Sequence, residues 1–276
     1  MNALASTHSP PAAAAVAALP RLSVAAPCYN EVDSLPQLAA AMDRLRAELA
    51  GKYDVEFVLV DDGSTDETWA LLKKMFGAHD DVRLVAHQHN RGIAAAIRTA
   101  IEHARGPLVA TIDADCTYDP CLISQMAPLC TGAVDMVVAS PYHPRGGVVG
   151  VSEWRLWLSK LASRLYRCVM RNKLHTYTSC FRVCRRQAVR ELPATSDGFV
   201  GVVELLWQLD RHGGVILEYP AQLRARCTGQ SKMRVARTAF AHLRLLARAA
   251  WLAVFARRAT ASVARPTAPV TLAQEQ

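Results

Sequence analysis

The sequence contains cysteines but lacks the spacings that would turn them into metal ligands or cross-links. None of the eight forms a CxxC pair, so neither a zinc-ligand pattern nor a dense disulfide framework is present. We therefore expect reduced and mostly packed thiols, which are typical of a cytosolic protein. The cysteines are Cys28, Cys116, Cys121, Cys130, Cys168, Cys180, Cys184 and Cys227.

Long apolar runs are also missing. No uninterrupted apolar stretch reaches the roughly 18 residues that a transmembrane helix requires, so we expect none. The Ala- and Pro-rich start, residues 1–20, has neither a basic n-region nor a convincing cleavage site. We interpret it as a disordered tail rather than a signal peptide.

Acidic residues are scarce in two parts of the chain. The formal net charge is +8, and the segments 154–190 and 224–258 are rich in Lys and Arg and poor in Asp and Glu. Such an uneven charge indicates an anionic partner, such as phosphate groups or acidic lipid head groups. The basic residues lack a nucleic-acid-binding motif and interleaved stacking aromatics, so we expect no nucleic acid partner.

Short apolar runs alternate with helical patterns five times between residues 21 and 140. Hydrophobic residues make up 51% of the chain, which is long enough at 276 residues to bury a sizeable core. The alternation predicts an α/β fold with a mostly parallel central sheet and helices on both faces. Polar clusters follow the ends of several strands, where ligands bind in such sheets.

The alternation stops after Ser140. We expect one domain over residues 21–235, with a first half (21–140) and a second half (141–235), followed by a basic amphipathic helix over 236–258 and a disordered tail over 259–276. Two interpretations of this helix stay open. It lies on an anionic membrane surface, or it packs on the domain with its arginines in solvent.

Two carboxylates one residue apart, Asp113 and Asp115, follow the apolar run that ends at Ile112. A strand that ends at the first aspartate lets the second swing round to the same side. Hard oxygen ligands at a strand end suit a divalent cation that also binds substrate phosphates. The alternative is a strand followed by a polar turn.

Six motifs in order resemble one protein family. They are PCYNE (27–31), VDDGSTD (60–66), NRG (90–92), DAD (113–115), TSCFR (178–182) and RCTGQSKM (226–233). Together they resemble the family 2 inverting glycosyltransferases with the GT-A nucleotide-diphospho-sugar fold, and within it the dolichyl- and polyprenyl-phosphate sugar synthases. The resemblance covers roughly residues 22–233.

The resemblance implies a nucleoside-diphosphate sugar as donor and Mg²⁺ or Mn²⁺ on its diphosphate. The metal ligands it implies are Asp113, Asp115 and Thr117, where Thr117 replaces the family's usual glutamine. The donor-binding residues it implies are Pro27, Tyr29, Glu31, Val60, Asp61, Asp62, Asp113, Ala114, Arg226 and Lys232.

The resemblance also implies a polyprenyl (dolichyl or undecaprenyl) phosphate as acceptor, whose phosphate binds Ser140, Arg145, Ser179 and Arg182. Arg145 stands in here for a family arginine that is Pro141 in this chain, and Cys180 replaces a family glycine. Asp115, Arg182 and Lys232 are the residues expected to act in catalysis. The enzyme would be peripheral on the cytoplasmic face of an anionic membrane surface.

Two alternatives keep the same fold. In one, the acceptor is a lipid or saccharide hydroxyl, and Asp197 or Glu204 serves as the base that such an acceptor needs. In the other, the chain is a non-catalytic nucleotide-sugar-binding module that its basic half recruits to membranes. An intact Asp113/Asp115 pair speaks against the second alternative.

Overall fold

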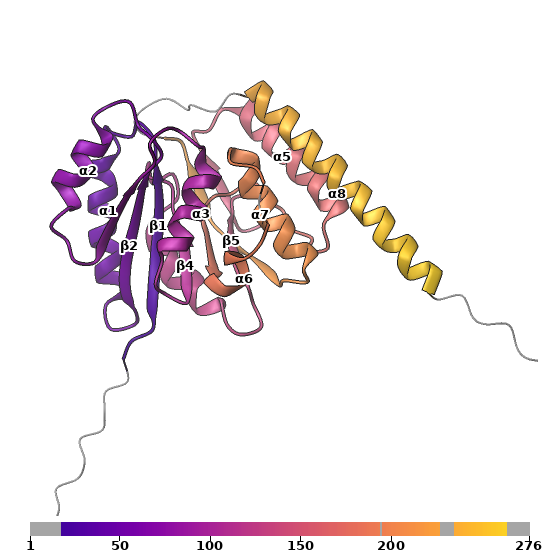
Figure 1. Cartoon of the computed structure of the whole chain (residues 1–276), viewed down its shortest axis with the longest axis horizontal. Coiled ribbons are helices and arrows are strands. Elements are labelled where there is room, and N and C mark those ends of the chain that lie inside the picture. Colours follow the sequence, from indigo (N-terminus) through magenta and orange to yellow (C-terminus); the bar gives the residue numbers. More distant parts are fainter. Residues whose placement is uncertain (1–17, 194, 227–234, 264–276) are drawn as a thin grey trace, which may run out of the picture.

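The computed structural model describes residues 18–193, 195–226 and 235–263. In the first half, strands and helices alternate as predicted (Figure 1). The elements are β1 (Arg21–Cys28), α1 (Leu35–Leu49), β2 (Asp54–Asp61), α2 (Thr68–Phe76), β3 (Val82–Ala86), α3 (Ile93–His103), β4 (Leu108–Thr111), η1 (Pro120–Leu122), α4 (Ile123–Met126), η2 (Ala127–Leu129) and β5 (Met136–Ser140).

The second half completes the main sheet and adds helices beside it. Its elements are β6 (Gly147–Val149), α5 (Glu153–Val169), β7 (Arg182–Arg185), α6 (Arg186–Arg190), α7 (Phe199–Arg211), β8 (Ile216–Pro220), β9 (Gln222–Arg224) and α8 (Val235–Val263). The main sheet has seven strands in the order β3-β2-β1-β4-β7-β5-β8. Only β7 runs antiparallel to its neighbours β4 and β5, so the predicted mostly parallel sheet is confirmed.

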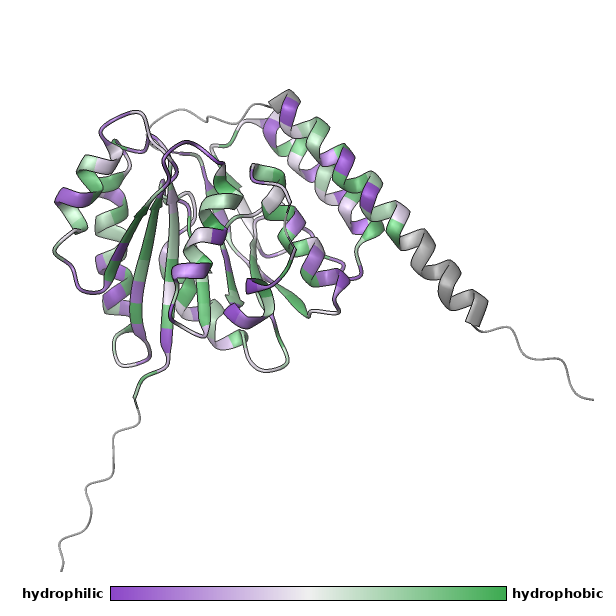
Figure 2. Ribbon diagram, in the orientation of Figure 1, coloured by the Kyte–Doolittle hydropathy of each residue, from purple (hydrophilic) through white to green (hydrophobic). Residues whose placement is uncertain are grey.

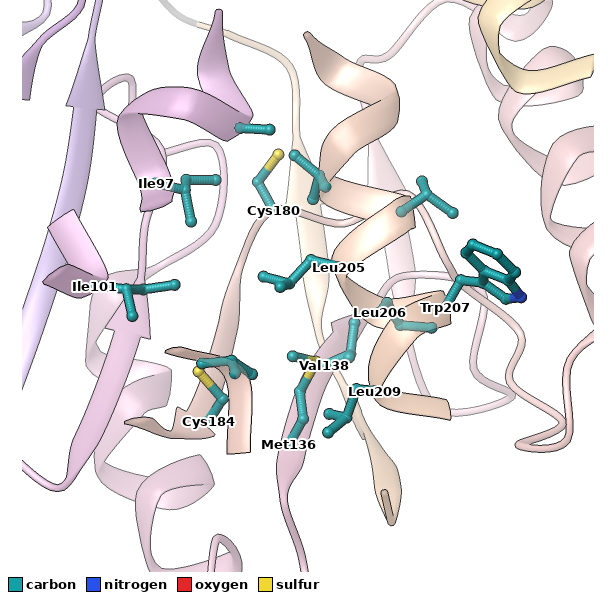
Figure 3. Close-up of a cluster of buried hydrophobic side chains, with 14 of the residues drawn as sticks. Ile97, Ile101, Met136, Val138, Cys180, Cys184, Leu205, Leu206, Trp207 and Leu209 are labelled. Carbon is teal, nitrogen blue, oxygen red and sulfur yellow. The ribbon is translucent and has the colours of Figure 1, made fainter. Parts of the chain in front are cut away.

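Helices cover both faces of this sheet, as predicted, and each face has its own core. Strand β1 alternates between them, since Leu22, Val24 and Ala26 pack toward α1 and Ala25 packs toward α3. The α3 side forms the larger core with α7, where Ile97, Leu205 and their neighbours meet (Figure 3). Because the sheet is buried on both faces, its strands need hydrophobic side chains in both directions, and their central residues are mostly hydrophobic (Figure 2).

Small residues let α3 and α7 approach closely on that face. Ala94, Ala95 and Ala96 of α3 are buried, and a Cβ added to Gly201 of α7 would lie 2.6 Å from the Cβ of Ala94. Two helices whose backbones come this near leave no room for a larger side chain. The position of α7 against the sheet therefore depends on Gly201.

Two segments of the chain are less regular than the rest. Residues 120–129 form η1, α4 and η2 in succession, and Pro128, which has no N–H, follows the end of α4 at Met126. After Thr176 the next residues that pair in the main sheet are those of β7 (Arg182–Arg185). Its backbone enters between β4 and β5, a placement that local pattern does not encode.

Helix α8 packs on the domain along one stripe. Leu245 and Ala249 are buried against it, and the Tyr166 hydroxyl of α5 lies 2.9 Å from Nδ1 of His242. The helix extends to Val263, beyond the end expected at residue 258. Within the described ranges, no helix combines the length and the apolarity needed to cross a membrane. Every cysteine in those ranges is free.

Candidate active site

Strand β4 carries the Asp113/Asp115 pair to the edge of the sheet. Ile112 still donates its N–H to the Ala25 carbonyl of β1, and the chain then turns with Cys116 at φ 51°. The Cys116 N–H closes this turn on the Asp113 carbonyl at 3.0 Å. Because the chain turns here, both carboxylates line the same cavity.

The two carboxylates influence each other. Burial, and next the neighbouring Asp115 carboxylate, raise the pKa of Asp113 to about 7, whereas Arg226 and Thr117 oppose the shift. Asp113 therefore binds a proton more readily than an ordinary aspartate. A cation placed between the two carboxylates would oppose this shift, because positive charge favours the ionised form of both.

Arg226 holds Asp115 from the opposite side. It follows β9, and its guanidinium donates from Nε to Oδ2 of Asp115 at 2.5 Å and from Nη2 to Oε1 of Glu31 at 2.7 Å. Arg226, the first residue of the RCTGQSKM segment, thus joins the loop after β1 to one of the two aspartates that follow β4. The structure brings together three of the predicted site residues that lie far apart in the sequence.

The side chains of Asp113, Asp115 and Thr117 are of the kinds that bind a divalent cation. Asp113 and Asp115 supply carboxylate oxygens, and the Thr117 hydroxyl lies 3.5 Å from Oδ2 of Asp113. In the part of the chain that the structure describes, no three His, Cys, Asp or Glu side chains form a complete metal cage. Mg²⁺ and similar hard cations accept such sparse protein ligation when a substrate's phosphates and water complete the shell.

Asp61 is the last residue of β2 and Asp62 follows it, and both carboxylates accept hydrogen bonds from the chain itself. The Asp62 carboxylate is buried and accepts from the N–H groups of Arg91 and Gly92, at 3.0 and 2.7 Å, and from the Asn90 amide at 3.0 Å. Nδ1 of His87 lies 2.7 Å from Oδ1 of Asp62, the oxygen that also accepts from Arg91. Asp61 accepts from the backbone and the hydroxyl of Ser64.

These contacts hold the 87–92 loop against the strand end. Gly92 has φ 105°, and a Cβ there would lie 2.5 Å from the Asp197 carbonyl, so only glycine fits. The predicted direct donor contact of Asp62 does not match this geometry, because its oxygens are occupied by the loop. Its role here is to shape the edge on which a donor would rest.

The other predicted donor residues lie along the same edge. Pro27 and Val60 are register partners in β1 and β2, and Tyr29 and Glu31 continue from β1. Val60 and Ala114 have buried side chains, so any donor contact from them would come from their backbone. Lys232 lies outside the described residues.

A cavity of about 470 Å³ extends from Asp113 and Asp115 toward α5 and α8. Thr117, Tyr118, Thr176 and Ser179 line its polar end. Farther from the carboxylates its walls are apolar and come from both helices. These wall residues include Trp154, Leu158, Leu161 and Leu165 of α5 and Leu243 and Leu246 of α8.

Three of the four predicted acceptor-phosphate residues do not face this cavity. Arg182 is buried, and its guanidinium donates to the carbonyls of Ser179, Val202 and Tyr177 at 2.7, 2.7 and 3.0 Å. Ser140 is buried with its hydroxyl 2.9 Å from that of Thr176, and Arg145 is exposed away from the cavity lining. Ser179 alone of the four lines it.

The phosphate prediction for Arg182 is therefore not supported, for a physical reason. Burial lowers the pKa of this guanidinium to about 10, and three backbone carbonyls occupy its donors. Arg182 is the first residue of β7, and the helices that cover the sheet bury its side chain. Its function in this structure is to hold the 177–179 segment that forms the cavity's polar end.

Sequence reasoning missed Arg155. It lies in the first turn of α5 and is the one Lys or Arg among the described residues of the cavity lining. Its guanidinium lies 5.2 Å from the ring centroid of Trp154. The basic character of residues 154–190 was a signal, but it did not distinguish this arginine from its neighbours.

The two residues considered as bases also have other partners. Glu204 is buried in α7, accepts from Thr195 and Ser196 and pairs with Arg248 of α8 at 3.2 Å. Asp197 is half-exposed and pairs with Arg98. Neither lines the cavity, so the structure does not support the base that a hydroxyl acceptor would need.

Comparison with known proteins gives one family. The sequence profile described as Glycosyl transferase family 2 matches residues 23–193. The chain is 29% identical to the polyprenol monophosphomannose synthase of Mycolicibacterium smegmatis, over 77% of this chain and 81% of that one. It is 25% identical to the dolichol-phosphate mannosyltransferase of Pyrococcus furiosus, over 81% of this chain and 62% of that one.

A third relative is the undecaprenyl-phosphate 4-deoxy-4-formamido-L-arabinose transferase of Pseudomonas fluorescens, 32% identical over 64% of this chain and 53% of that one. The chain thus spans little more than half the length of some relatives.

Solved structures share the fold. The mannosyl-3-phosphoglycerate synthase of Rubrobacter xylanophilus superposes with a TM-score of 0.59 at 18% identity, over 92% of this chain and 78% of that one. The glucosyl-3-phosphoglycerate synthase of Mycobacterium tuberculosis, crystallised with Mn²⁺, uridine diphosphate and phosphoglyceric acid, gives 0.57 at 19% identity, over 90% and 80%.

Proposed function

The chain belongs to glycosyltransferase family 2, and we propose that it moves a sugar from a nucleoside-diphosphate sugar to a polyprenyl phosphate, with inversion at the anomeric carbon. The donor half is residues 21–140 and the acceptor half residues 141–235. The reaction takes place at an anionic membrane surface on the cytoplasmic side. Relatives named for polyprenyl-phosphate acceptors support this assignment.

The observation that carries the proposal is the shape of the cavity. Its polar end contains Asp113 and Asp115, and its long walls are the apolar sides of α5 and α8. A phosphate on a hydrocarbon chain has the same two-part chemistry. A free sugar or a small phosphorylated acid would leave the apolar walls without a partner.

The donor's diphosphate would lie at the aspartate pair. Asp113, Asp115 and Thr117 would hold Mg²⁺ or Mn²⁺, which when bound neutralises the charge on the departing nucleoside diphosphate. Glu31 and the strand-end backbone at Pro27 and Val60 would hold the nucleoside.

Arg226 is positioned to meet the same negative charge. Its guanidinium reaches Asp115 and Glu31, and a diphosphate offers equivalent oxygens at this edge. Lys232, outside the described residues, belongs to the same segment and is proposed for the same role.

The acceptor's phosphate would be held by Arg155 and Ser179 at the cavity's polar end. A phosphate monoester already carries negative charge near neutral pH, so its oxygen can attack without a protein base. One bond forms between that oxygen and the anomeric carbon as the bond from that carbon to the diphosphate breaks. The absence of a carboxylate base among the described lining residues other than the aspartate pair fits this chemistry.

The test is direct transfer of label. Purified protein is incubated with Mn²⁺, undecaprenyl phosphate and a panel of radiolabelled nucleotide sugars, and label in the lipid phase is counted. We expect label from one donor, abolished in Asp115→Ala and retained in the control Asp43→Ala, whose carboxylate is exposed on α1.

Other outcomes separate the alternatives. Metal-dependent release of nucleotide without lipid label would keep the donor site and reject the lipid acceptor. If folded protein showed neither, the binding-module interpretation would replace the enzyme.

A further inference from the structure

A buried imidazole lies behind the edge of the sheet where the donor would bind. His87 follows β3, and its side chain is 6% exposed beside the Asp62 carboxylate, which is 3% exposed. Nδ1 lies 2.7 Å from Oδ1 of Asp62, and Nε2 lies 2.9 Å from the Thr99 hydroxyl of α3. Because both ring nitrogens have a partner, the ring is fixed between the end of β2 and α3.

The direction of the bond between His87 and Asp62 follows from the chemistry of a carboxylate. An ionised carboxylate only accepts hydrogen bonds, so Nδ1 of His87 carries the proton and donates it. Among the described ion pairs, His87 is the one partner of Asp62 that can carry positive charge. Without it, this buried carboxylate would keep only neutral N–H and amide donors.

Asp62 passes the constraint to the loop that follows His87. Its Oδ1 also accepts from the Arg91 N–H, and its Oδ2 accepts from the Gly92 N–H. The terminal torsion of an aspartate side chain is soft, so contacts on both oxygens are needed to hold the carboxylate in one orientation. Loss of the imidazole from Oδ1 would therefore also loosen the backbone that the carboxylate binds.

The loop after β2 contacts the loops on either side of it. A Cβ added to Gly63 would lie 2.3 Å from the backbone carbonyl carbon of His89, so these two loops touch. On the other side, the Ser64 hydroxyl accepts from the Asn30 N–H at 2.9 Å. Asn30 directly precedes Glu31, which is proposed to hold the nucleoside. The loops from three strand ends thus form one connected edge.

We propose that His87 is a positioning residue for the donor. By holding Asp62, it sets the loops of this edge before a nucleoside diphosphate arrives, so that binding does not have to order them. The inference rests on the donor site of the proposed function and makes no use of the acceptor. Its signature is a higher KM for the donor with an unchanged kcat.

Two substitutions separate the two nitrogens of the ring. The amide of asparagine can donate from the place of Nδ1, and the amide of glutamine reaches the place of Nε2. His87→Asn thus keeps the bond to Asp62 and loses the bond to Thr99, whereas His87→Gln does the reverse. Each variant loses one bond and part of the ring, so both should lower the Tm by similar amounts.

The decisive measurement is the Kd of a nucleoside diphosphate with Mn²⁺, obtained by calorimetry without lipid. The uridine, guanosine, adenosine and cytidine diphosphates are titrated in turn, and the one that binds is used throughout. We expect His87→Gln to raise the Kd about tenfold and His87→Asn to change it less than about threefold, because only the first loses the bond to a charged partner. The control His89→Gln, on an exposed histidine of the same loop, should leave the Kd unchanged.

A double-mutant cycle shows whether His87 acts through Asp62. In the background of Asp62→Ala, which removes both oxygens, His87→Gln should raise the Kd less than about twofold further. Additive effects of the two substitutions would overturn the positioning role, and so would equal Kd values in His87→Asn and His87→Gln.

The same titration distinguishes this inference from the proposed function. Nucleotide binding that depends on His87 as expected, without any label in the lipid phase, would reject the lipid acceptor and support the positioning role. Transfer of label together with equal Kd values in the two His87 variants would reject the positioning role alone. If none of the four nucleoside diphosphates bound to the unchanged protein, both proposals would be wrong.

Discussion

Two arginines show how differently one residue type is used at this site. Arg155 faces the cavity, whereas Arg182 is buried with its donors on three backbone carbonyls. Both lie in the second half of the chain, yet only the first can meet a substrate without moving. Their substitution should therefore have opposite signatures.

We expect Arg155→Gln to raise the KM for the lipid phosphate about tenfold or more while leaving the free energy of unfolding unchanged, because it removes a charge-assisted contact from an exposed side chain. Arg182→Gln should lower the free energy of unfolding by about 3 kcal/mol, since buried carbonyls lose their donors. Denaturant titration and steady-state kinetics measure both. A large KM effect in stable Arg182→Gln would restore its predicted phosphate role.

Arg226 and a divalent cation have a common partner in Asp115. The guanidinium donates to Oδ2 of that carboxylate at 2.5 Å. In Arg226→Gln we expect Mn²⁺ to bind the nucleotide-free protein about tenfold more tightly, because a competing charge-assisted bond is lost. Titration followed by electron paramagnetic resonance measures this affinity. The control is Arg224→Gln, whose partner is Gln222; weaker Mn²⁺ binding in Arg226→Gln would contradict the expectation.

The pKa of Asp113 sets a pH dependence for metal binding. The folded protein keeps a proton on this carboxyl up to about pH 7, against an ordinary value of 3.8. A cation must displace that proton below pH 7, so Mn²⁺ affinity should fall about tenfold per pH unit below 7 and level off above it. Asp113→Asn should bind weakly with no such slope between pH 6 and 8. A flat profile in the unchanged protein would contradict this.

At the scale of elements, Glu204 links α7 to α8 and to the segment before α7. Its carboxylate pairs with Arg248 at 3.2 Å and accepts from the Ser196 N–H at 2.8 Å. The segment continues to Asp197, whose carbonyl accepts from the first turn of α3 beside the 87–92 loop. A single buried carboxylate thus joins α7 and α8 to the segment that contacts the start of α3 and the 87–92 loop.

Glu204→Gln should lower the free energy of unfolding by about 1–3 kcal/mol, because a charged acceptor of several bonds becomes a neutral one. The kcat of the folded variant should stay within a few-fold, as expected for a residue outside the cavity. Asp197→Asn is the control, since its half-exposed ion pair with Arg98 contributes little. Loss of kcat by 100-fold or more without loss of stability would make Glu204 the base instead.

At the scale of the whole molecule, ligand binding should be visible as stability. Donor loops from three strand ends meet at one edge, so a bound nucleoside diphosphate with Mn²⁺ restrains all of them. At 100-fold excess over Kd this linkage is worth about 2.7 kcal/mol, or a rise of about 5–10 °C in Tm. A thermal-shift panel of nucleoside diphosphates should single out one base. Equal shifts with all bases, or shifts that need no metal, would contradict this account of the site.

Much of the fold was open to prediction because it depends on local pattern. The hydrophobic periodicity of neighbouring residues predicts strands such as β2 and amphipathic helices such as α1. Their alternation predicts a parallel sheet. The paired aspartates after β4 were visible for the same reason. Thr117 and Arg226 could be named only through the family motifs.

The contacts that the sequence did not predict join residues that are distant along the chain. Arg182 was predicted from its motif to bind phosphate, and in the structure it is buried and its guanidinium donates to three backbone carbonyls. Asp62 was predicted to bind the donor, and in the structure its carboxylate accepts hydrogen bonds from the 87–92 loop. Arg155 had no motif, and it became a candidate only because α5 forms a wall of the cavity.

The alternation of strands and helices, the sign of the charge on α5 and α8, and the carboxylates at the strand ends can be read from the sequence, since each is a property of residues close together in the chain. The insertion of antiparallel β7 between β4 and β5, the bridge from Arg226 to Glu31 and Asp115, and the cavity beside α5 and α8 became evident from the folded structure. Each of these joins segments that are distant along the chain, and their meeting depends on packing of the whole domain rather than on any local preference.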